Sequence, residues 1–215
     1  MNSPAVTAVI DRLREAGRVQ DPIARRRLAD GEARGRLSAD ERAEMCRAAP
    51  LAVSDETARL LYLLAAGTSG GRVVEFGCSL GLSTLYLAAA LRDRGGGSLT
   101  TTELDGEKAV AARRNLLDAG LADLVEVRTG DALETLTDLE GPVDLLMLDG
   151  WNELYIPVLQ LVGPLVSAGG LVVADMSRED PCSIAYLEHV SNPANGFFSV
   201  ELPIDAGVVL SRRVA

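Results

Sequence analysis

The fold of this chain is decided by residues Arg72 to Asp105, which read RVVEFGCSLGLSTLYLAAALRDRGGGSLTTTELD. An apolar strand leads into a glycine loop, a helix and a second strand that ends in an acid. Gly77 and Gly81 remove side chains where the backbone must turn and approach a ligand. Ser83 lies where the helix begins, and the unpaired N–H groups of a helix start favour an anionic group. This layout predicts a site for a nucleotide-type cofactor.

The loop spacing discriminates between adenosine cofactors. Glu103, at the end of the second strand, can accept hydrogen bonds from two ribose hydroxyls. The dinucleotide pattern G-x-G-x-x-G requires three glycines, whereas this loop has only Gly77 and Gly81. Glu75, just before the loop, would repel a pyrophosphate but suits an ammonium or a sulfonium. S-adenosylmethionine is therefore favoured over NAD, and an NAD-binding Rossmann oxidoreductase remains an alternative.

Acids follow the later strands in the same way. Asp131 comes after an apolar strand at 125–129, and Asp149 comes after one at 143–148. In an open parallel sheet, ligands bind outside the carboxyl ends of the strands. We therefore expect Glu75, Glu103, Asp131 and Asp149 to converge on one crevice.

Strands and helices alternate regularly from residue 54 onward, which predicts an α/β fold with a parallel sheet covered on both faces. The expected strands are 72–76, 98–103, 125–129, 143–148 and 170–174. The expected helices are 54–66, 83–92, 106–119, 132–139 and 155–165. Two further strands, 197–202 and 207–213, are separated by a short turn and should form an antiparallel hairpin at the sheet edge.

The motifs in this order resemble those of class I S-adenosylmethionine-dependent methyltransferases. The matching segments are VVEFGCSLGLSTLYLA, TTELD, TGDALETL and LLMLDGWNELYIPVLQLVGPLVSAGGLVVADM. Within the class, the chain is similar to the catechol O-methyltransferase-like enzymes that act on small molecules. The resemblance covers about residues 54–181. It implies a Rossmann-like fold with a seven-stranded, mostly parallel sheet, helices on both faces and a C-terminal antiparallel hairpin.

The resemblance also implies roles for individual residues. It places Glu75, Gly77 and Ser83 around the methionine part of the cofactor, Glu103 on the ribose, and Asp131 beside the adenine. The cofactor set that it implies is Glu75, Gly77, Ser79, Gly81, Ser83, Glu103, Leu104, Asp131, Ala132, Asp149 and Trp151. The implied reaction is methylation of an oxygen on a small molecule, with a small-molecule N-methyltransferase as an alternative.

The residues expected around the methyl acceptor differ from those of the metal-dependent members of the family. Asp149 and Asp175 stand in the acid positions, but Met176 replaces an asparagine and Asn152 replaces a lysine. A thioether is a poor ligand for magnesium or calcium. We therefore expect no essential metal, with Asp149 and Asp175 as weak candidate ligands and a metal-assisted catechol-type enzyme as the alternative. Asp149, Asp175 and Asn152 are the catalytic candidates; Asn152 can orient a hydroxyl but cannot act as a base.

The composition limits the partners and the compartment. The formal net charge is −10, which disfavours a nucleic-acid substrate because a phosphate backbone selects clustered Lys and Arg. Three cysteines show no close pair, which is typical of the reducing cytoplasm. No run of about 18 apolar residues indicates a membrane span. The expected partner is a small-molecule methyl acceptor in the cytoplasm.

The first part of the chain, residues 1–53, is predicted to form a helical extension ahead of a cofactor-binding domain at 54–215. Breaks are expected at Asp21-Pro22, Gly31, Gly35 and Pro50, and a capping box at Ser38 predicts a helix from about Ala39. The extension cannot join the sheet, so we expect it to cap the site or to form a homodimer contact. A cofactor-binding protein without catalysis remains a further alternative, because of Met176 and Asn152.

Overall fold

Seven strands form one sheet in the computed structural model, which describes residues 3–32 and 37–214. In spatial order they are β3 (Val125–Thr129), β2 (Ser98–Glu103), β1 (Arg72–Phe76), β4 (Val143–Leu148), β5 (Val166–Asp175), β7 (Val208–Arg213) and β6 (Phe197–Leu202). The strands β1 to β5 pair in parallel, while β7 is antiparallel to both of its neighbours. The predicted sheet and its C-terminal hairpin are confirmed.

The centre of the sheet is apolar on both faces, as its position predicts. Every residue of β4 is buried, and Val74 of β1 pairs with Leu146 of β4. Strands covered on both faces are near-continuous apolar runs. The strand order reverses direction between β1 and β4, and such a switch point opens a crevice at the carboxyl ends of the strands.

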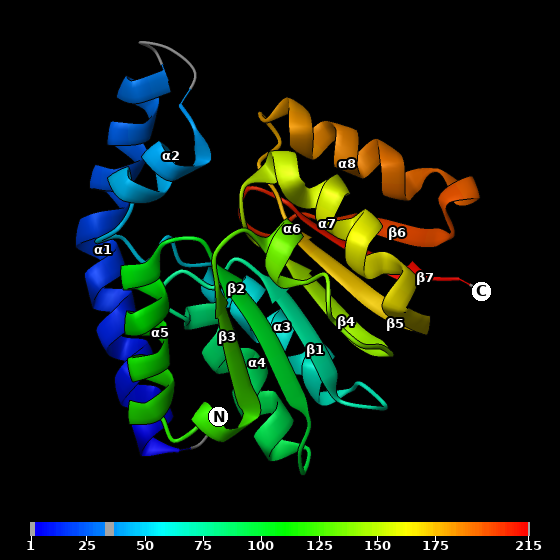
Figure 1. The fold of residues 1–215 in the computed structure, drawn as a ribbon, viewed down its shortest axis with the longest axis horizontal. Helices are drawn as coiled ribbons and strands as arrows, with labels where there is room; N and C mark the ends of the chain where they lie inside the picture. The colour runs from blue at the N-terminus through cyan, green and yellow to red at the C-terminus, as the bar shows by residue number, and fades with distance from the viewer. Residues whose placement is uncertain (1–2, 33–36, 215) are drawn as a thin grey trace.

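Helices cover both faces of the sheet (Figure 1). One apolar core lies beneath α1 (Pro4–Glu32), α3 (Asp55–Ala66), α4 (Leu82–Asp93) and α5 (Gly106–Asp118). The other lies beneath α6 (Ala132–Thr135), α7 (Tyr155–Val162) and α8 (Pro181–Ser191). The remaining helix is α2 (Ala39–Met45), and four 3-10 turns are Ala122–Leu124, Asn152–Leu154, Gly163–Leu165 and Pro193–Asn195.

The break predicted at Asp21-Pro22 is wrong, because α1 continues through Pro22 and Gly31 to Glu32. A proline inside a helix removes one backbone hydrogen bond and costs about 3 kcal/mol. Tertiary contacts offset this cost. The buried face of α1 packs on the core, and the Asp21 carboxylate accepts a 2.8 Å hydrogen bond from the Leu51 N–H. The break expected at Gly35 lies outside the described residues.

Other element ends differ from the prediction by a few residues. The capping box at Ser38 is present and α2 begins at Ala39, as predicted. The helix expected at 132–139 ends at Thr135. The helix expected at 155–165 becomes a 3-10 turn after Val162, and β5 begins at Val166 rather than at 170. Helix ends are the least certain part of a sequence pattern because end residues make few intrahelical hydrogen bonds.

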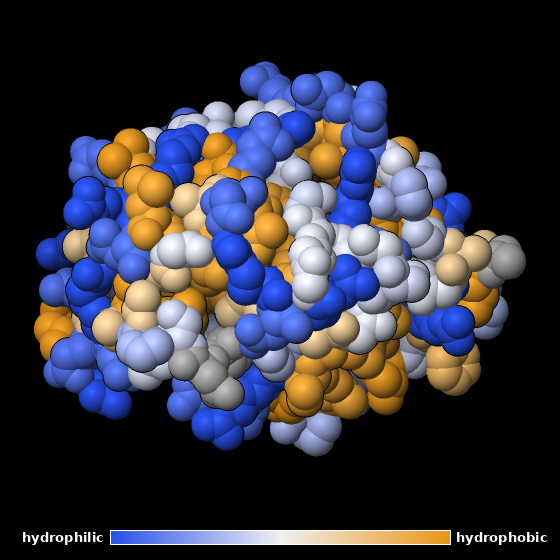
Figure 2. Space-filling view, turned by 90° about the horizontal axis from the view of Figure 1, so that it is seen from below, coloured by the Kyte–Doolittle hydropathy of each residue, from blue (hydrophilic) through white to orange (hydrophobic). Residues whose placement is uncertain are grey.

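Polar contacts attach α1 and α2 to the rest of the molecule. Arg12 of α1 donates to Asn115 on α5 at 2.7 Å. After α2, Arg47 forms a 2.8 Å ion pair with Asp105. None of the described helices is long and apolar enough to cross a membrane. On the face shown in Figure 2, hydrophilic residues are interspersed among apolar ones.

Gly77 is expected to stabilise the fold, because only a glycine fits the conformation of the loop at this position. Its φ is +90°, and a Cβ added there would lie 2.6 Å from the Asp149 carbonyl oxygen. Gly77→Ala should therefore lower the free energy of unfolding by at least about 2 kcal/mol, through left-handed strain and overlap. Gly106→Ala is the matched control, because a Cβ there meets no atom within 4 Å. Denaturant titration of both variants is the measurement, and equal stabilities would contradict this account.

Candidate active site

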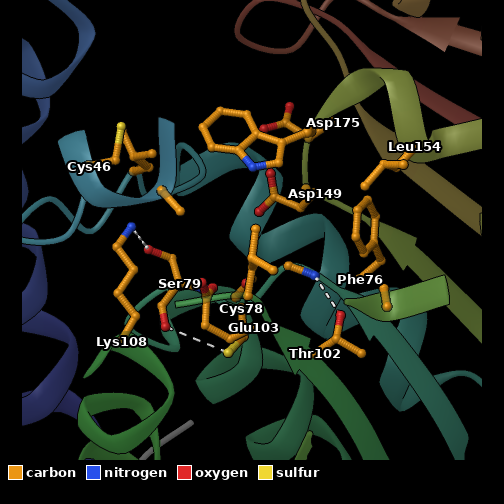
Figure 3. A pocket seen from close by; sticks show the side chains of 18 of the residues that line it. Cys46, Phe76, Cys78, Ser79, Thr102, Glu103, Lys108, Asp149, Leu154 and Asp175 are labelled. Carbon is orange, nitrogen blue, oxygen red and sulfur yellow. Dashed lines mark hydrogen bonds between the residues drawn. The ribbon is translucent and has the colours of Figure 1, made fainter. Parts of the chain in front are cut away.

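A cavity of about 580 Å³ lies at the carboxyl ends of the parallel strands (Figure 3). Each strand from β1 to β5 contributes a residue at or just beyond its end: Gly77, Glu103, Asp131, Asp149 and Asp175. Residues of α1 and α2 line the opposite side, including Arg25, Leu28 and Ala43. The sheet therefore supplies acids from one side, and the N-terminal helices close the cavity from the other.

The glycine loop after β1 is held to the neighbouring strand by backbone contacts. The Cys78 N–H donates to the Thr102 carbonyl at 2.9 Å, and the Gly77 N–H donates to the Thr102 hydroxyl at 3.3 Å. Ser79 adopts a left-handed conformation, with a φ of 50°. These contacts hold the loop against β2, and Gly77 and Ser79 line the cavity.

Glu103 connects the loop to the end of β2. Its Oε2 accepts from the Ser79 N–H at 2.8 Å, and its Oε1 accepts from the Asp105 N–H at 2.9 Å. Burial raises the pKa of this carboxyl, while the two backbone donors lower it. Each carboxylate oxygen can accept more than one hydrogen bond, so a ligand can still bind to Glu103 from the cavity side.

Glu75 does not line the cavity, so the expectation that four strand-end acids converge is wrong for this residue. It is fully buried, and its Oε2 accepts from the Thr84 and Thr101 hydroxyls, each at 2.6 Å. Glu75 lies inside β1, one residue before the strand ends. Its side chain therefore points to a face of the sheet and not past the carboxyl end of the strand. Its contacts join β1, β2 and the start of α4 beneath the loop.

At the start of α4, Ser83 faces the cavity but Gly81 does not. Ser83 is buried, 3% exposed, and lines the cavity. Gly81 is the N-cap of α4, with a φ of +92°, and does not line the cavity. A Cβ at Gly81 would lie 3.6 Å from the Ala112 side chain, so this glycine permits the turn and the approach of α5.

The ends of β2 and β3 form a second wall of the cavity from Leu104, Asp131 and Ala132. Asp131 is exposed, and its carboxylate caps α6 by accepting from the Leu133 N–H at 2.8 Å. The cap occupies one carboxylate oxygen and leaves the other available.

Asp149 and Asp175 form an acidic pair at the ends of β4 and β5. Burial raises the pKa of Asp149 well above its ordinary value, and the charges of Asp175 and Glu75 raise it further. Burial also raises the pKa of Asp175 to about 6, with a contribution from the charge of Asp205. Arg25 is the cation that opposes both shifts. A carboxyl with a pKa near 6 can exchange a proton close to neutral pH.

Residues 74–175 match a family described as a methyltransferase domain. The cofactor-bound crystal structure of Rv0187 from MTB is 30% identical, with a TM-score of 0.68, over 75% of this chain and 81% of that chain. The O-methyltransferase TomG from Streptomyces achromogenes, in complex with SAM, is 26% identical with a TM-score of 0.68, over 77% of this chain and 82% of that one.

Residues 74–175 therefore form a methyltransferase domain, and S-adenosylmethionine-dependent O-methyltransferases are among the proteins to which the chain is similar.

A catechol O-methyltransferase from Mycobacterium tuberculosis is 38% identical over 140 residues, which are 65% of this chain. The match spans 61% of that relative's length, so this methyltransferase covers somewhat less than two thirds of it. The region that matches the family runs from β1 to the end of β5. It therefore contains all five strand-end residues of the cavity, whereas α1 and α2 lie outside it.

At the ends of β4 and β5, the two aspartates are the oxygen donors that face the cavity. Asp149 and Asp175 line the cavity, but Met176 offers a thioether. Asn152 is not in the cavity lining, and its amide donates to Asp180 at 3.2 Å. Among residues 3–32 and 37–214, no group of three or more His, Cys, Asp or Glu side chains is placed to hold a metal ion.

Trp151 lines the cavity beside the acidic pair. The Arg42 guanidinium of α2 lies 4.5 Å from the centroid of its ring and also pairs with Glu153. Trp151 therefore joins the end of β4 to the N-terminal helices, a contact that its position in the sequence did not indicate.

Several lining residues were not predicted from the sequence. Arg25 and Cys46 come from the N-terminal region, Asp205 comes from the hairpin turn, and Lys108 comes from the first turn of α5. Lys108 is only 4% exposed. A signal for it was present, because Lys108 lies five residues after Glu103, at the start of the next helix.

Proposed function

We propose that this protein transfers the methyl group of S-adenosylmethionine to an oxygen of a small molecule. The observation that carries the proposal is the position of Glu103 and Asp149 on one cavity, with the glycine loop of Gly77 and Ser79 between their strands. This arrangement provides an acceptor for a ribose diol at one strand end and a half-buried carboxylate at another.

The donors and acceptors of the cavity fit this cofactor. We assign Glu103 to the ribose, and Leu104, Asp131 and Ala132 to the adenine. We assign the methionine part to Gly77, Ser79 and Ser83. Glu75 supports the loop from below through Thr84 and Thr101, and Gly81 permits its turn. Asp149 and Trp151 lie where the cofactor meets the acceptor.

The protein's part in the reaction is positioning and proton transfer. When bound, S-adenosylmethionine supplies an activated methyl group on a sulfonium. The residues of the cavity wall would position the acceptor oxygen next to that methyl group. Asp149, whose pKa is raised, accepts the proton of the acceptor hydroxyl. Besides burial, the negative charge of Asp175 contributes to the raised pKa of Asp149. Asn152 serves to anchor Asp180 and takes no proton.

The acceptor is proposed to be a small hydroxylated molecule with a planar ring. Phe76, Trp151 and Leu154 provide apolar surface on the wall near the acidic pair. The proteins to which the chain is similar include a catechol O-methyltransferase and an O-methyltransferase involved in tomaymycin synthesis. We propose that no metal is essential, because Met176 and Asn152 do not complete a donor set with the two aspartates.

We also propose that the protein acts in the cytoplasm as a homodimer. The three cysteines, Cys46, Cys78 and Cys182, are free, which suits a reducing compartment. On α1, Val19 is 56% exposed and Ile23 is 44% exposed, and these side chains suit a contact between copies. A monomeric mass by light scattering at micromolar concentration would contradict the dimer.

Calorimetric titration of S-adenosylhomocysteine into metal-stripped protein tests the proposed function. We expect micromolar binding that is unchanged by added magnesium, because the assigned cofactor contacts involve no metal. NADH is the control ligand, and it should bind at least about tenfold more weakly because the loop has no third glycine. Tighter binding of NADH would favour an oxidoreductase, and a requirement for magnesium would favour the metal-assisted enzyme.

A further inference from the structure

Lys108 is a cation of the cavity wall to which the proposed function gives no ligand contact. The chain contains twenty arginines and a single lysine, Lys108. That lysine is buried on the cavity wall at the third position of α5, 4% exposed. Lysine is among the residues that are least often buried without a partner. Its place in this cavity therefore calls for an anion.

The neighbouring carboxylates act on Lys108 through their charges but do not form an ion pair with it among the described residues. Lys108 Nζ donates to the Ser79 hydroxyl at 2.9 Å. Glu103 already accepts from two backbone N–H groups. Asp105 accepts from Arg47 and from the N–H groups at the start of α5. An ammonium has three donors, so two N–H donors of Lys108 remain for a ligand.

Lys108 and the acidic pair of Asp149 and Asp175 lie in different parts of the cavity wall. Figure 3 shows Lys108 on one side of the pocket and Phe76 and Leu154 on the other, with its ammonium directed to Ser79. The acidic pair lies nearer the apolar side, where the acceptor is proposed to bind. A zwitterionic ligand with a cationic sulfonium near Asp149 can thus place an anion near Lys108.

We propose that the Lys108 ammonium, held in place by its hydrogen bond to the Ser79 hydroxyl, binds the α-carboxylate of the amino-acid part of the cofactor. This inference rests on the proposed function, because it takes S-adenosylmethionine as the ligand. That carboxylate is the only anionic group of the cofactor, since its ribose and adenine are neutral. A compact ammonium with free donors on the same side as the loop serine is suited to a single carboxylate.

The test compares two ligands that differ only in this carboxylate. S-adenosylhomocysteine carries it, and decarboxylated S-adenosylhomocysteine keeps the amine but lacks it. Lys108→Met should weaken binding of the first by at least about 30-fold and of the second by less than about threefold. Arg113→Met is the matched control on α5. Arg113 donates to Val127 and Thr129 away from the cavity, so both affinities should stay unchanged.

The outcomes separate this inference from the proposed function. Tight binding of S-adenosylhomocysteine to the wild type, with equal losses for both ligands in Lys108→Met, would overturn the role of Lys108 alone. No binding to the wild type would overturn the proposed function, and the inference with it.

A second measurement on the wild type does not depend on the variant folding. Because Lys108 is the only lysine, acetylation by an amine-reactive reagent can be followed on one peptide by mass spectrometry. At equal saturation, S-adenosylhomocysteine should slow the reaction of Lys108 at least about tenfold more than the decarboxylated ligand does. Equal protection by the two ligands would overturn the inference.

Discussion

Replacing Glu103 with alanine is expected to weaken the binding of S-adenosylhomocysteine by at least about 100-fold, as measured by calorimetry. A carboxylate that accepts from two ribose hydroxyls makes two charge-assisted hydrogen bonds, each contributing about 1.5–3 kcal/mol. Their loss corresponds to a factor of at least about 100 in the dissociation constant. The alanine also leaves the Ser79 and Asp105 N–H groups without their acceptor.

Two further variants separate these contributions. Glu103→Gln keeps one acceptor oxygen, so it should retain more affinity than the alanine variant. Glu107→Ala is the matched control, because this acid lies nearby on α5 but is exposed and does not line the cavity. An analogue without one ribose hydroxyl should lose affinity for the wild type but little for Glu103→Ala. If both proteins lose the same factor, Glu103 does not bind the ribose.

Replacing Asp149 with asparagine is expected to lower kcat for methyl transfer by at least about 100-fold, which is the usual contribution of a positioned general base. The substitution keeps the shape of the side chain and removes its proton affinity. The measurement is transfer of a labelled methyl group to catechol and to simple phenols. Asp138→Asn is the control, because Asp138 is exposed and pairs with Arg128 outside the cavity. An Asp149→Asn enzyme with wild-type kcat would remove Asp149 from the chemistry.

The pH dependence of kcat provides a second test of the acidic pair. A base must be ionised to accept a proton, so the rate should rise with pH as Asp149 ionises. This acid limb should lie well above the ordinary range of an aspartate, because burial and the charge of Asp175 raise the pKa of Asp149. Asp175→Asn removes the negative charge that raises the pKa of Asp149. The acid limb of the profile should then move to lower pH. An unmoved limb would mean that the two carboxyls do not interact.

Much of the sheet could be predicted from the sequence because the residues that indicate a strand are adjacent in the chain. Buried parallel strands are short apolar runs, and here they are closed by glycines or acids. The bounds 72–76, 98–103, 125–129, 143–148 and 197–202 agree with the structure to the residue. The division into a helical extension at 1–53 and a cofactor domain at 54–215 stays a prediction, although α1 and α2 contribute to the cavity wall.

The errors share a physical cause. Pro22 indicated a helix break, but its local cost is offset by contacts of α1 with residues far along the chain. Glu75 was expected in the crevice because it lies near a strand end. A side chain inside a strand points to one face, however, so it meets Thr84 and Thr101 instead. The catalytic role of Asn152 stays a prediction, and its amide donates to Asp180.

The sequence by itself determined the order of strands and helices, the glycine loop, and the acids Glu103, Asp131 and Asp149 at the strand ends. These features depend on periodicity and on residues adjacent in the chain. Only the tertiary structure decided that Lys108 reaches Ser79, that Arg25 lines the same cavity, and that Asp175 has a raised pKa. Each of these depends on burial and on distances between segments that are far apart in sequence, which no local pattern records.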